Sequence, residues 1–342
     1  MIKRNIGIVD FELYLPEQKI TAEALSPLVN IPANVLRDKM GINEKHVGGP
    51  EDHSAMMATK ASKRLLEKTN TDPNDLDMIL YAGETYCEYV CWTAAIKIQN
   101  ELGADRAYAW DLGFRCAATP LALKVAKDMM LADENCNTVL VTGGNTNAYL
   151  VDYTDKIQSF MFDMSPAGLA ILLKKDHDKN IVLETGIITD HVFCDDVIGK
   201  FGGSLHPITD EIASDPETLR KARVLHLPDP EGMKGRLGAR SLPNFVNAVK
   251  MATERSKVDK PLDFIGITHI NPKAHVAILN ELGMEESQSV YLKDNGHCGH
   301  VDQFLALQYG LEQGLVQSGS LVGLLGAGTG YAFACTVVKW GE

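Results

Sequence analysis

The residues from Tyr108 to Pro120 read YAWDLGFRCAATP, and this stretch decides the fold and the chemistry expected of the chain. A strand pattern runs into Cys116, and Pro120 follows in a position that suits a first helical turn. A thiol at a strand-to-helix junction lies at the positive end of the helix dipole, which favours the thiolate and lowers the thiol pKa. The stretch therefore predicts a nucleophilic cysteine. A buried, unreactive cysteine is the alternative interpretation.

Composition indicates a globular protein of the cytoplasm. The chain has 342 residues, 45% of them hydrophobic, and a formal net charge of −12, which argues against a nucleic-acid partner. No apolar run reaches the roughly 20 residues that span a bilayer, and no signal-peptide core follows Met1, so we expect no membrane partner. The seven scattered cysteines fit a reducing compartment and no metal-site spacing, so we expect no bound metal.

The two halves of the chain repeat one ordered series of elements at a shift of roughly 180 to 186 residues. A strand, helix, strand, helix order in each copy predicts an α/β fold of layers with mainly parallel central sheets. Cys116 in the first copy corresponds closely to His297 in the second. The other matched segments are Leu76–Glu84 with Leu262–His269, Ile98–Gly103 with Ile278–Gly283, and Val139–Gly144 with Leu321–Gly326.

The repeat also predicts the domain organisation. Residues 1–175 form an N-terminal half that carries the nucleophile, and residues 176–342 form a C-terminal half that carries the histidines. The charged turn at Leu173–Asn180 marks the join. Residues 194–240, rich in proline, glycine and charge, interrupt the repeat and are predicted to be an insertion that caps the site.

Polar side chains at predicted strand ends indicate where the site lies. Sites in layered α/β folds form beyond the carboxyl ends of the strands, where we expect Glu84, Cys116, His269 and His297 to meet in one pocket. A cysteine with two histidines, a carboxylate and a glycine-rich turn suits acyl transfer through a thioester. The turn Gly326–Gly330 offers backbone N–H groups to an oxyanion and matches neither a phosphate loop nor a dinucleotide fingerprint.

Each of these residues has a plainer interpretation. His269 also suits a core histidine whose hydrogen bonds are satisfied, and Glu84 also suits a partly solvated residue that holds the following loop. His297 also suits a residue that only begins a helix or lies on the surface, and that is what we expect of His300.

Five motifs resemble the thiolase superfamily, and most of all its β-ketoacyl-acyl-carrier-protein synthase III branch, over essentially the full chain. The resemblance implies a five-layered fold and a homodimer whose partner closes part of the acyl pocket. It also implies that Cys116 carries the acyl group, that His269 assists condensation, and that backbone N–H groups of Cys116 and of Gly328–Thr329 form the oxyanion hole. The motifs are Tyr14–Pro16, Met40–His46, Cys116–Ala118, His269–Asn271 and Gly326–Tyr331.

The resemblance further implies thioesters of coenzyme A or acyl carrier protein as substrates, with no tightly bound cofactor. Among the matching regions, Asn271 and Asn295 are candidate substrate contacts. Candidate contacts to the coenzyme are the basic residues Arg37, Lys39 and Lys273.

Two residues depart from the synthase III pattern. His297 occupies the usual place of an asparagine, so two histidines would polarise the thioester carbonyl. Glu84 resembles the acid/base glutamate of hydroxymethylglutaryl-CoA synthases.

The leading hypothesis is a condensing enzyme in which a malonyl-type thioester loses carbon dioxide and attacks the acyl group on Cys116, giving a 3-oxoacyl thioester. One alternative is condensation without decarboxylation through Glu84, and a second is acyl transfer without condensation. A silent partner subunit is the non-enzymatic alternative.

Overall fold

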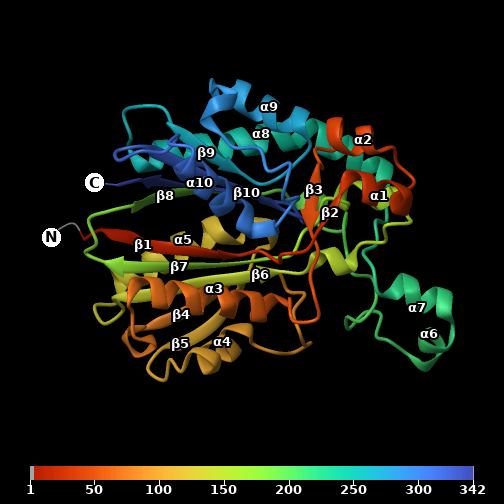
Figure 1. The fold of residues 1–342 in the computed structure, drawn as a ribbon, viewed down its shortest axis with the longest axis horizontal. Helices are drawn as coiled ribbons and strands as arrows, with labels where there is room; N and C mark the ends of the chain where they lie inside the picture. The colour runs from red at the N-terminus through yellow and green to blue at the C-terminus, as the bar shows by residue number, and fades with distance from the viewer. Residues whose placement is uncertain (1–3, 342) are drawn as a thin grey trace.

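The computed structural model describes residues 4–341 as stacked layers of helices and sheet (Figure 1). Nine strands form one sheet in the order β5-β4-β6-β7-β1-β8-β11-β10-β9, and β2 pairs with β3 apart from it. The strands are β1 (Ile6–Tyr14), β2 (Lys19–Thr21), β3 (Glu44–His46), β4 (Met78–Gly83), β5 (Tyr108–Gly113), β6 (Thr138–Asn145), β7 (Ala167–Lys175), β8 (Ile181–Thr189), β9 (Phe264–Ile267), β10 (Leu321–Gly328) and β11 (Ala332–Lys339).

Helices cover both outer faces of this sheet and fill the space where it folds back on itself. The α-helices are α1 (Ala22–Val29), α2 (Ala33–Asp38), α3 (Ser54–Thr69), α4 (Ala94–Leu102), α5 (Ala118–Ala132), α6 (Asp210–Ser214), α7 (Pro216–Ala222), α8 (Pro230–Ser256), α9 (Pro272–Leu282) and α10 (Asp302–Glu312). Helices α3 and α4 pack on the first half of the sheet, α8 and α9 pack on the second, and α5 and α10 lie between the halves (Figure 1). This is the five-layered α/β arrangement expected from the sequence.

Four pairs of strands confirm the repeat between the two halves, whereas β5 has no counterpart in the described part of the second half. The pair β4 and β6 corresponds to β9 and β10, and β7 and β1 correspond to β11 and β8. The two matched helices α4 and α9 each end at a glycine in the left-handed conformation, Gly103 with φ 68° and Gly283 with φ 67°, which glycine adopts without strain. The turn that joins β7 to β8 lies where the join between the halves is predicted.

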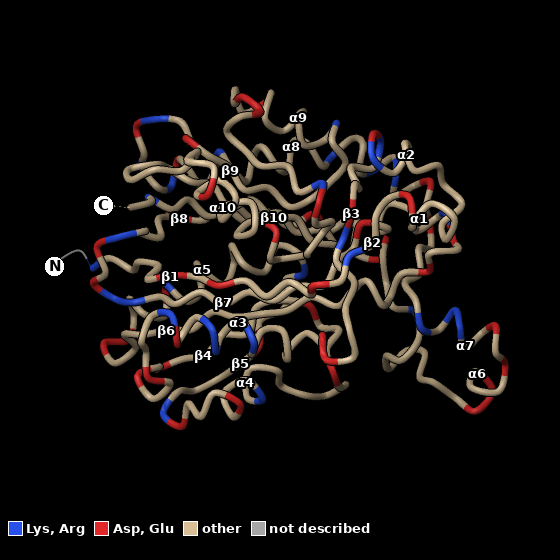
Figure 2. The backbone as a smooth tube through the Cα atoms, in the orientation of Figure 1, with Lys and Arg blue, Asp and Glu red and all other residues tan. Residues whose placement is uncertain are grey.

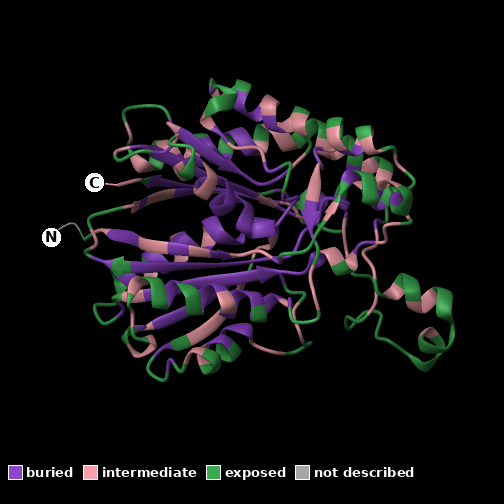
Figure 3. Ribbon diagram, in the orientation of Figure 1, coloured by how far each residue is buried: buried purple, intermediate pink, exposed green. Residues whose placement is uncertain are grey.

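The sheet contains both parallel and antiparallel pairs of strands. The parallel pairing expected from the strand–helix order occurs between β4 and β5, β4 and β6, and β9 and β10. The strands at the centre pair antiparallel, β6 with β7, β7 with β1 and β8 with β11, so the sheet is mixed. The strands at the centre of the sheet are largely buried (Figure 3). Because both faces are covered, they carry apolar residues continuously: in β4, Leu80 faces the central helices and Ile79 faces α3 and α4.

The predicted insertion differs from the structure in its extent and its role. Residues 230–240 belong to α8, which runs to Ser256 and packs on β8 and β11. Helices α6 and α7 project away from the layers and have no buried residue (Figures 1 and 3). The expectation that this stretch caps the site is therefore wrong for residues 194–229, none of which lines the main cavity. Within residues 4–341, no helix has the length and apolar character needed to cross a bilayer.

Close contact between sheet and helix predicts opposite effects of two alanine substitutions. A Cβ atom on Gly186 in β8 would lie 2.2 Å from the carbonyl oxygen of Ala248 in α8, whereas a Cβ atom on Gly235 in α8 would meet open space. Gly186→Ala should lower the free energy of unfolding by about 1 to 3 kcal/mol. Gly235→Ala should raise it by about 0.5 to 1 kcal/mol. Urea titration measures both, and equal midpoints for Gly186→Ala and the wild type would contradict the packing of α8 on β8.

Candidate active site

The four predicted residues meet at the carboxyl ends of corresponding strands. Cys116 lies in the short 3-10 helix η2 (Arg115–Ala117) between β5 and α5, and His297 lies just before its counterpart η7 (Gly299–Val301) and α10. The helices η2 and η7 pack on each other. Glu84 follows β4, and His269 comes two residues after β9. The duplicated topology therefore brings residues far apart in the sequence to one place.

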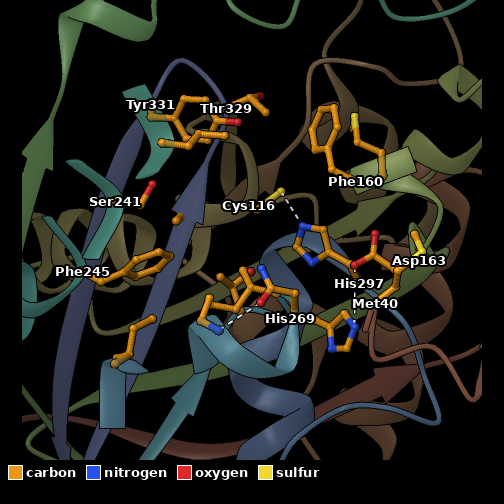
Figure 4. Close-up of a pocket in the computed structure, with 18 of the residues that line it drawn as sticks. Met40, Cys116, Phe160, Asp163, Ser241, Phe245, His269, His297, Thr329 and Tyr331 are labelled. Carbon is orange, nitrogen blue, oxygen red and sulfur yellow. Dashed lines mark hydrogen bonds and ion pairs between the residues drawn. The ribbon is translucent and has the colours of Figure 1, made fainter. Parts of the chain in front are cut away.

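Cys116, His297 and Asp302 form a hydrogen-bonded triad, of which Figure 4 shows the contact between Cys116 and His297. The Sγ atom of Cys116 lies 3.2 Å from Nε2 of His297, and Nδ1 of His297 lies 2.6 Å from Oδ2 of Asp302. Because a carboxylate can only accept, Nδ1 of His297 donates to Asp302, and Nε2 faces the sulfur of Cys116. Asp302 begins α10 and was not among the residues predicted from the sequence.

Several further groups hold Asp302 in place. Its side chain is fully buried and accepts hydrogen bonds from the backbone N–H of His269 at 2.6 Å and of Cys298 at 2.7 Å. The hydroxyl of Thr268 donates to it at 3.2 Å. Hydrogen bonds from several donors stabilise a buried carboxylate in its ionised form.

Burial and neighbouring charges shift the pKa values of Cys116 and His297 in opposite directions. Burial raises the pKa of the Cys116 thiol to about 11, His297 opposes this rise, and Glu84 adds to it. Burial alone would lower the pKa of His297, but the carboxylate of Asp302 and the contact with Cys116 outweigh it, so this pKa lies well above its ordinary value. The expectation that the helix dipole lowers the Cys116 pKa is wrong, because burial dominates. The raised pKa of His297 makes its imidazole a strong proton acceptor next to the sulfur.

Glu84 reaches the same sulfur from the other side. It is buried, with Oε1 3.5 Å from Sγ of Cys116 and Oε2 3.6 Å from Nη1 of Arg115. Arg115 adopts the left-handed conformation with φ 54° and donates to the hydroxyl of Thr85. Glu84 is thus a buried member of the site and not a partly solvated strand-end residue.

His269 lies beside the triad with its ring free of protein hydrogen bonds. Burial lowers its pKa to about 4, so the imidazole is neutral at neutral pH. Within the described residues, neither ring nitrogen has a hydrogen-bond partner, and Nε2 lies 3.6 Å from Oδ2 of Asp163. The interpretation of His269 as a satisfied core histidine is therefore wrong. Its N–H is available to a ligand.

The glycines of the predicted turn lie against Cys116, but Gly326 and Gly328 belong to β10 and only residues 329–331 form a turn. A Cβ atom on Gly328 would lie 3.0 Å from the backbone N of Cys116, and one on Gly326 would lie 2.8 Å from the Cys116 carbonyl oxygen. Only glycine allows this approach. Thr329, at the start of the turn, lines the cavity that holds Cys116.

That cavity has a volume of about 500 Å³ and is mainly apolar. Its polar lining includes Cys116, His297, His269 and Asp163 (Figure 4), together with Ser159, Ser241, Thr268, Asn271 and Thr329. The apolar lining comes from segments around α2, α8, α9 and β10–β11 and includes Met40, Ile42, Phe160, Met161, Met164, Leu237, Leu242, Phe245, Ile270, Ile278, Tyr331 and Phe333. Such a cavity suits a ligand with one polar end and an extended apolar part.

The remaining predicted residues lie at the edge of the site or behind it. Asn271 lines the cavity, although its side-chain oxygen caps α9. Asn295 lies outside the lining and contacts His46 and Tyr309 through Nδ2, at 3.2 and 3.0 Å. His300 lies in η7 at the start of α10, as one of its two expected roles required, but it is fully buried, so the surface alternative is wrong.

The three predicted coenzyme contacts lie near the ends of cavity-lining segments. Lys39 and Lys273 are exposed, each close in sequence to a lining residue, Met40 and Asn271 respectively. Arg37 forms an ion pair with Glu23.

Comparison with known proteins gives one consistent result. The family model for 3-oxoacyl-acyl-carrier-protein synthase III matches residues 110–191, which contain Cys116, and the model for its C-terminal part matches residues 255–340, which contain both histidines. β-Ketoacyl-acyl-carrier-protein synthase III of Natranaerobius thermophilus is 26% identical over 337 residues, covering 95% of this chain and 96% of that protein. The enzyme of the same name from Aliivibrio fischeri is 28% identical, covering 96% and 97%.

Solved structures share the fold over the whole chain. The synthase III of Pseudomonas aeruginosa has a TM-score of 0.84 at 18% identity and covers 99% of both chains. The priming ketosynthase of the R1128 polyketide pathway has a TM-score of 0.83 at 21% identity, with 99% and 97% covered. Matched families, full-length relatives and shared fold agree with the resemblance seen in the motifs. The chain belongs to the thiolase superfamily, among the condensing enzymes that resemble 3-oxoacyl-acyl-carrier-protein synthase III.

Proposed function

We propose that this enzyme loads an acyl group on Cys116 and condenses it with a malonyl-type thioester, releasing carbon dioxide and a 3-oxoacyl thioester. The observation that carries the proposal is the triad of Cys116, His297 and Asp302, placed beside His269 in an apolar cavity. A nucleophile paired with an oriented base forms acyl intermediates, and the apolar lining accommodates an acyl chain.

In the first half-reaction the sulfur attacks the carbonyl carbon of an acyl thioester. Nε2 of His297, 3.2 Å from Sγ, takes the thiol proton, and Asp302 stabilises the imidazolium that forms. The tetrahedral oxyanion accepts from the N–H groups of Cys116 and the Gly328–Thr329 turn. The carbon–sulfur bond to the donor breaks, and His297 returns the proton to the departing thiol.

In the second half-reaction a malonyl-type thioester enters beside the acylated cysteine. Its carbon–carboxylate bond breaks, and the electron pair forms an enolate whose oxygen accepts hydrogen bonds from His269 and from His297, whose raised pKa lets Nε2 take up a proton from solvent after the first thiol has left. The enolate carbon attacks the acyl carbonyl, a carbon–carbon bond forms and the bond to Sγ breaks. The thiolate then recovers a proton through His297. Neutral His269 acts as a donor without changing its charge, consistent with its low pKa.

The donor enters as a thioester of coenzyme A or of acyl carrier protein, with no tightly bound cofactor. Lys39 after α2 and Lys273 at the start of α9 provide positive charge near the cavity for phosphate groups, while Arg37 is already paired. Basic positions, in blue, occur along the tube at α2 (Figure 2). Asn271, between Lys273 and the cavity, is a proposed contact to the substrate.

The enzyme is further proposed to be a cytoplasmic homodimer. Strand β5 lies at one edge of the sheet with Tyr108 exposed, and the nearby loop exposes Tyr89 and Val90. An unpaired strand edge beside exposed apolar side chains suits a second copy of the chain.

The triad predicts separate effects on loading and on condensation. Wild-type protein should gain the mass of one acyl group on Cys116 when incubated with a panel of acyl-CoA donors, and should release carbon dioxide when a malonyl thioester follows. His297→Asn should slow acylation by about 10²-fold or more, because the base is lost. Cys116→Ala is the control that forms no adduct. Intact-mass spectrometry and trapped carbon dioxide are the readouts, and absence of an adduct with every donor would refute the proposal.

The position of Glu84 allows a direct test of the alternative reaction, which is condensation without decarboxylation. Its carboxylate lies 3.5 Å from Sγ of Cys116 and could serve as a base for an unactivated acetyl thioester. In the proposed reaction Glu84→Gln should change carbon dioxide release by less than about threefold, because Glu84 accepts no substrate proton there. The exposed Glu254→Gln is the matched control. A product that forms from acetyl thioesters and is lost in Glu84→Gln would support the alternative instead.

A further inference from the structure

Asp163 is a carboxylate in the cavity to which the reaction as described gives no role. It follows Phe162 between the 3-10 helix η4 (Lys156–Met161) and β7. Its backbone is fixed to the active-site loop, because its carbonyl oxygen accepts from the N–H of His297 at 2.8 Å. The side chain lines the cavity with Cys116, His269 and His297 (Figure 4).

The polar atoms of Asp163 and His269 leave a gap that the protein does not fill. Oδ1 of Asp163 is buried without a hydrogen-bond partner among the described residues, as are both ring nitrogens of His269. Oδ2 of Asp163 lies 3.6 Å from Nε2 of His269, too far for a good hydrogen bond. Buried polar groups are normally paired, so two such groups that face one cavity indicate a place for a polar atom of the substrate.

The surroundings of Asp163 move its pKa from the ordinary acidic range toward neutral pH. The charged and titratable groups around it are Lys45 on β3, Tyr153, His269, Tyr291, His297 and Asp302. Burial raises the Asp163 pKa to about 6 and Asp302 adds to the rise, while His297 and Lys45 oppose it. Nζ of Lys45 is held by the hydroxyl of Tyr153 at 2.5 Å and the carbonyl of Met164 at 2.8 Å. A substrate carboxylate nearby would raise the Asp163 pKa further.

We propose that protonated Asp163 is a further catalytic residue that donates a hydrogen bond, beside His269, to the carbonyl oxygen of the acceptor thioester as carbon dioxide leaves. The proposal rests on the proposed function. No proton is transferred from Asp163. The electron pair of the breaking carbon–carbon bond forms the enolate, and the O–H of Asp163 stabilises the negative oxygen. An ionised Asp163 would repel both the substrate carboxylate and the enolate.

Two variants separate a donor from a merely structural side chain. Asp163→Asn supplies an amide N–H at every pH, and Asp163→Leu supplies no donor. Acyl loading of Cys116 by intact mass and carbon dioxide release from malonyl thioesters of coenzyme A and acyl carrier protein are measured from about pH 5.5 to 8.5. Exposed Asp259→Asn is the matched control. Loading in both variants should stay within about threefold of the wild type, because the donor acts on condensation only.

Carbon dioxide release by the wild type should fall with rising pH, approaching about tenfold per pH unit above the Asp163 pKa. Asp163→Asn should lose this fall and exceed the wild type at about pH 8, and Asp163→Leu should be about 10²-fold slower throughout. If Asp163→Asn keeps the wild-type pH profile, or Asp163→Leu the wild-type rate, the Asp163 proposal is wrong while the proposed function stands. A wild type that loads acyl groups but releases no carbon dioxide overturns both.

Discussion

The hydrogen bond from His297 to the buried carboxylate of Asp302 is the interaction on which the rest of the site depends. It fixes the tautomer and orientation of the imidazole, so that Nε2 points at the sulfur of Cys116. Asp302 also accepts from the backbone of His269 and Cys298, which ties the end of β9 to the start of α10. One carboxylate therefore positions both histidines and supplies the charge that makes His297 a strong base.

The duplicated fold explains how such a centre is assembled. Each half delivers a short 3-10 helix to the same seam, one with the nucleophile and one preceded by the base. Glycines of β10 let the second half come within contact distance of the Cys116 backbone. A histidine in the place of the usual asparagine changes the chemistry at this seam, because an amide can donate but cannot take a proton from a thiol. Asp302 supplies the countercharge that a histidine needs there.

Much of the fold and of the site was predictable from the sequence. The repeat predicted the order of strands and helices, and the carboxyl ends of the strands predicted where the site lies. On that basis Cys116, His269 and His297 were correctly expected to line one cavity, whereas Glu84 contacts Cys116 but lies outside the cavity lining. The antiparallel pairing of the strands at the centre of the sheet was not predicted, since it depends on which connections between strands lack a helix. The prediction that residues 194–229 cap the site was also wrong. Their composition indicates a segment outside the repeat, but it does not show on which side of the fold that segment lies.

The residues that sequence analysis missed share a physical reason. Asp302 matters because the side chain of His297 folds back across a turn to meet it, and spacing alone does not show that contact. Asp163 lies inside the apolar run Phe160–Met164, where a carboxylate is itself a signal of a buried polar site. The raised pKa of Cys116 follows from its depth in the fold and is invisible in a motif.

The rate at which iodoacetamide alkylates Cys116 tests most directly whether Asp302 raises the basicity of His297. Peptide mapping at about pH 8 separates Cys116 from the other thiols, and the exposed Asp259→Asn serves as the control. If the account is right, Asp302→Asn slows alkylation of Cys116 by about tenfold or more, because the His297 pKa falls and the sulfur loses its base. Alkylation of Cys116 at the wild-type rate in a folded Asp302→Asn protein would contradict it.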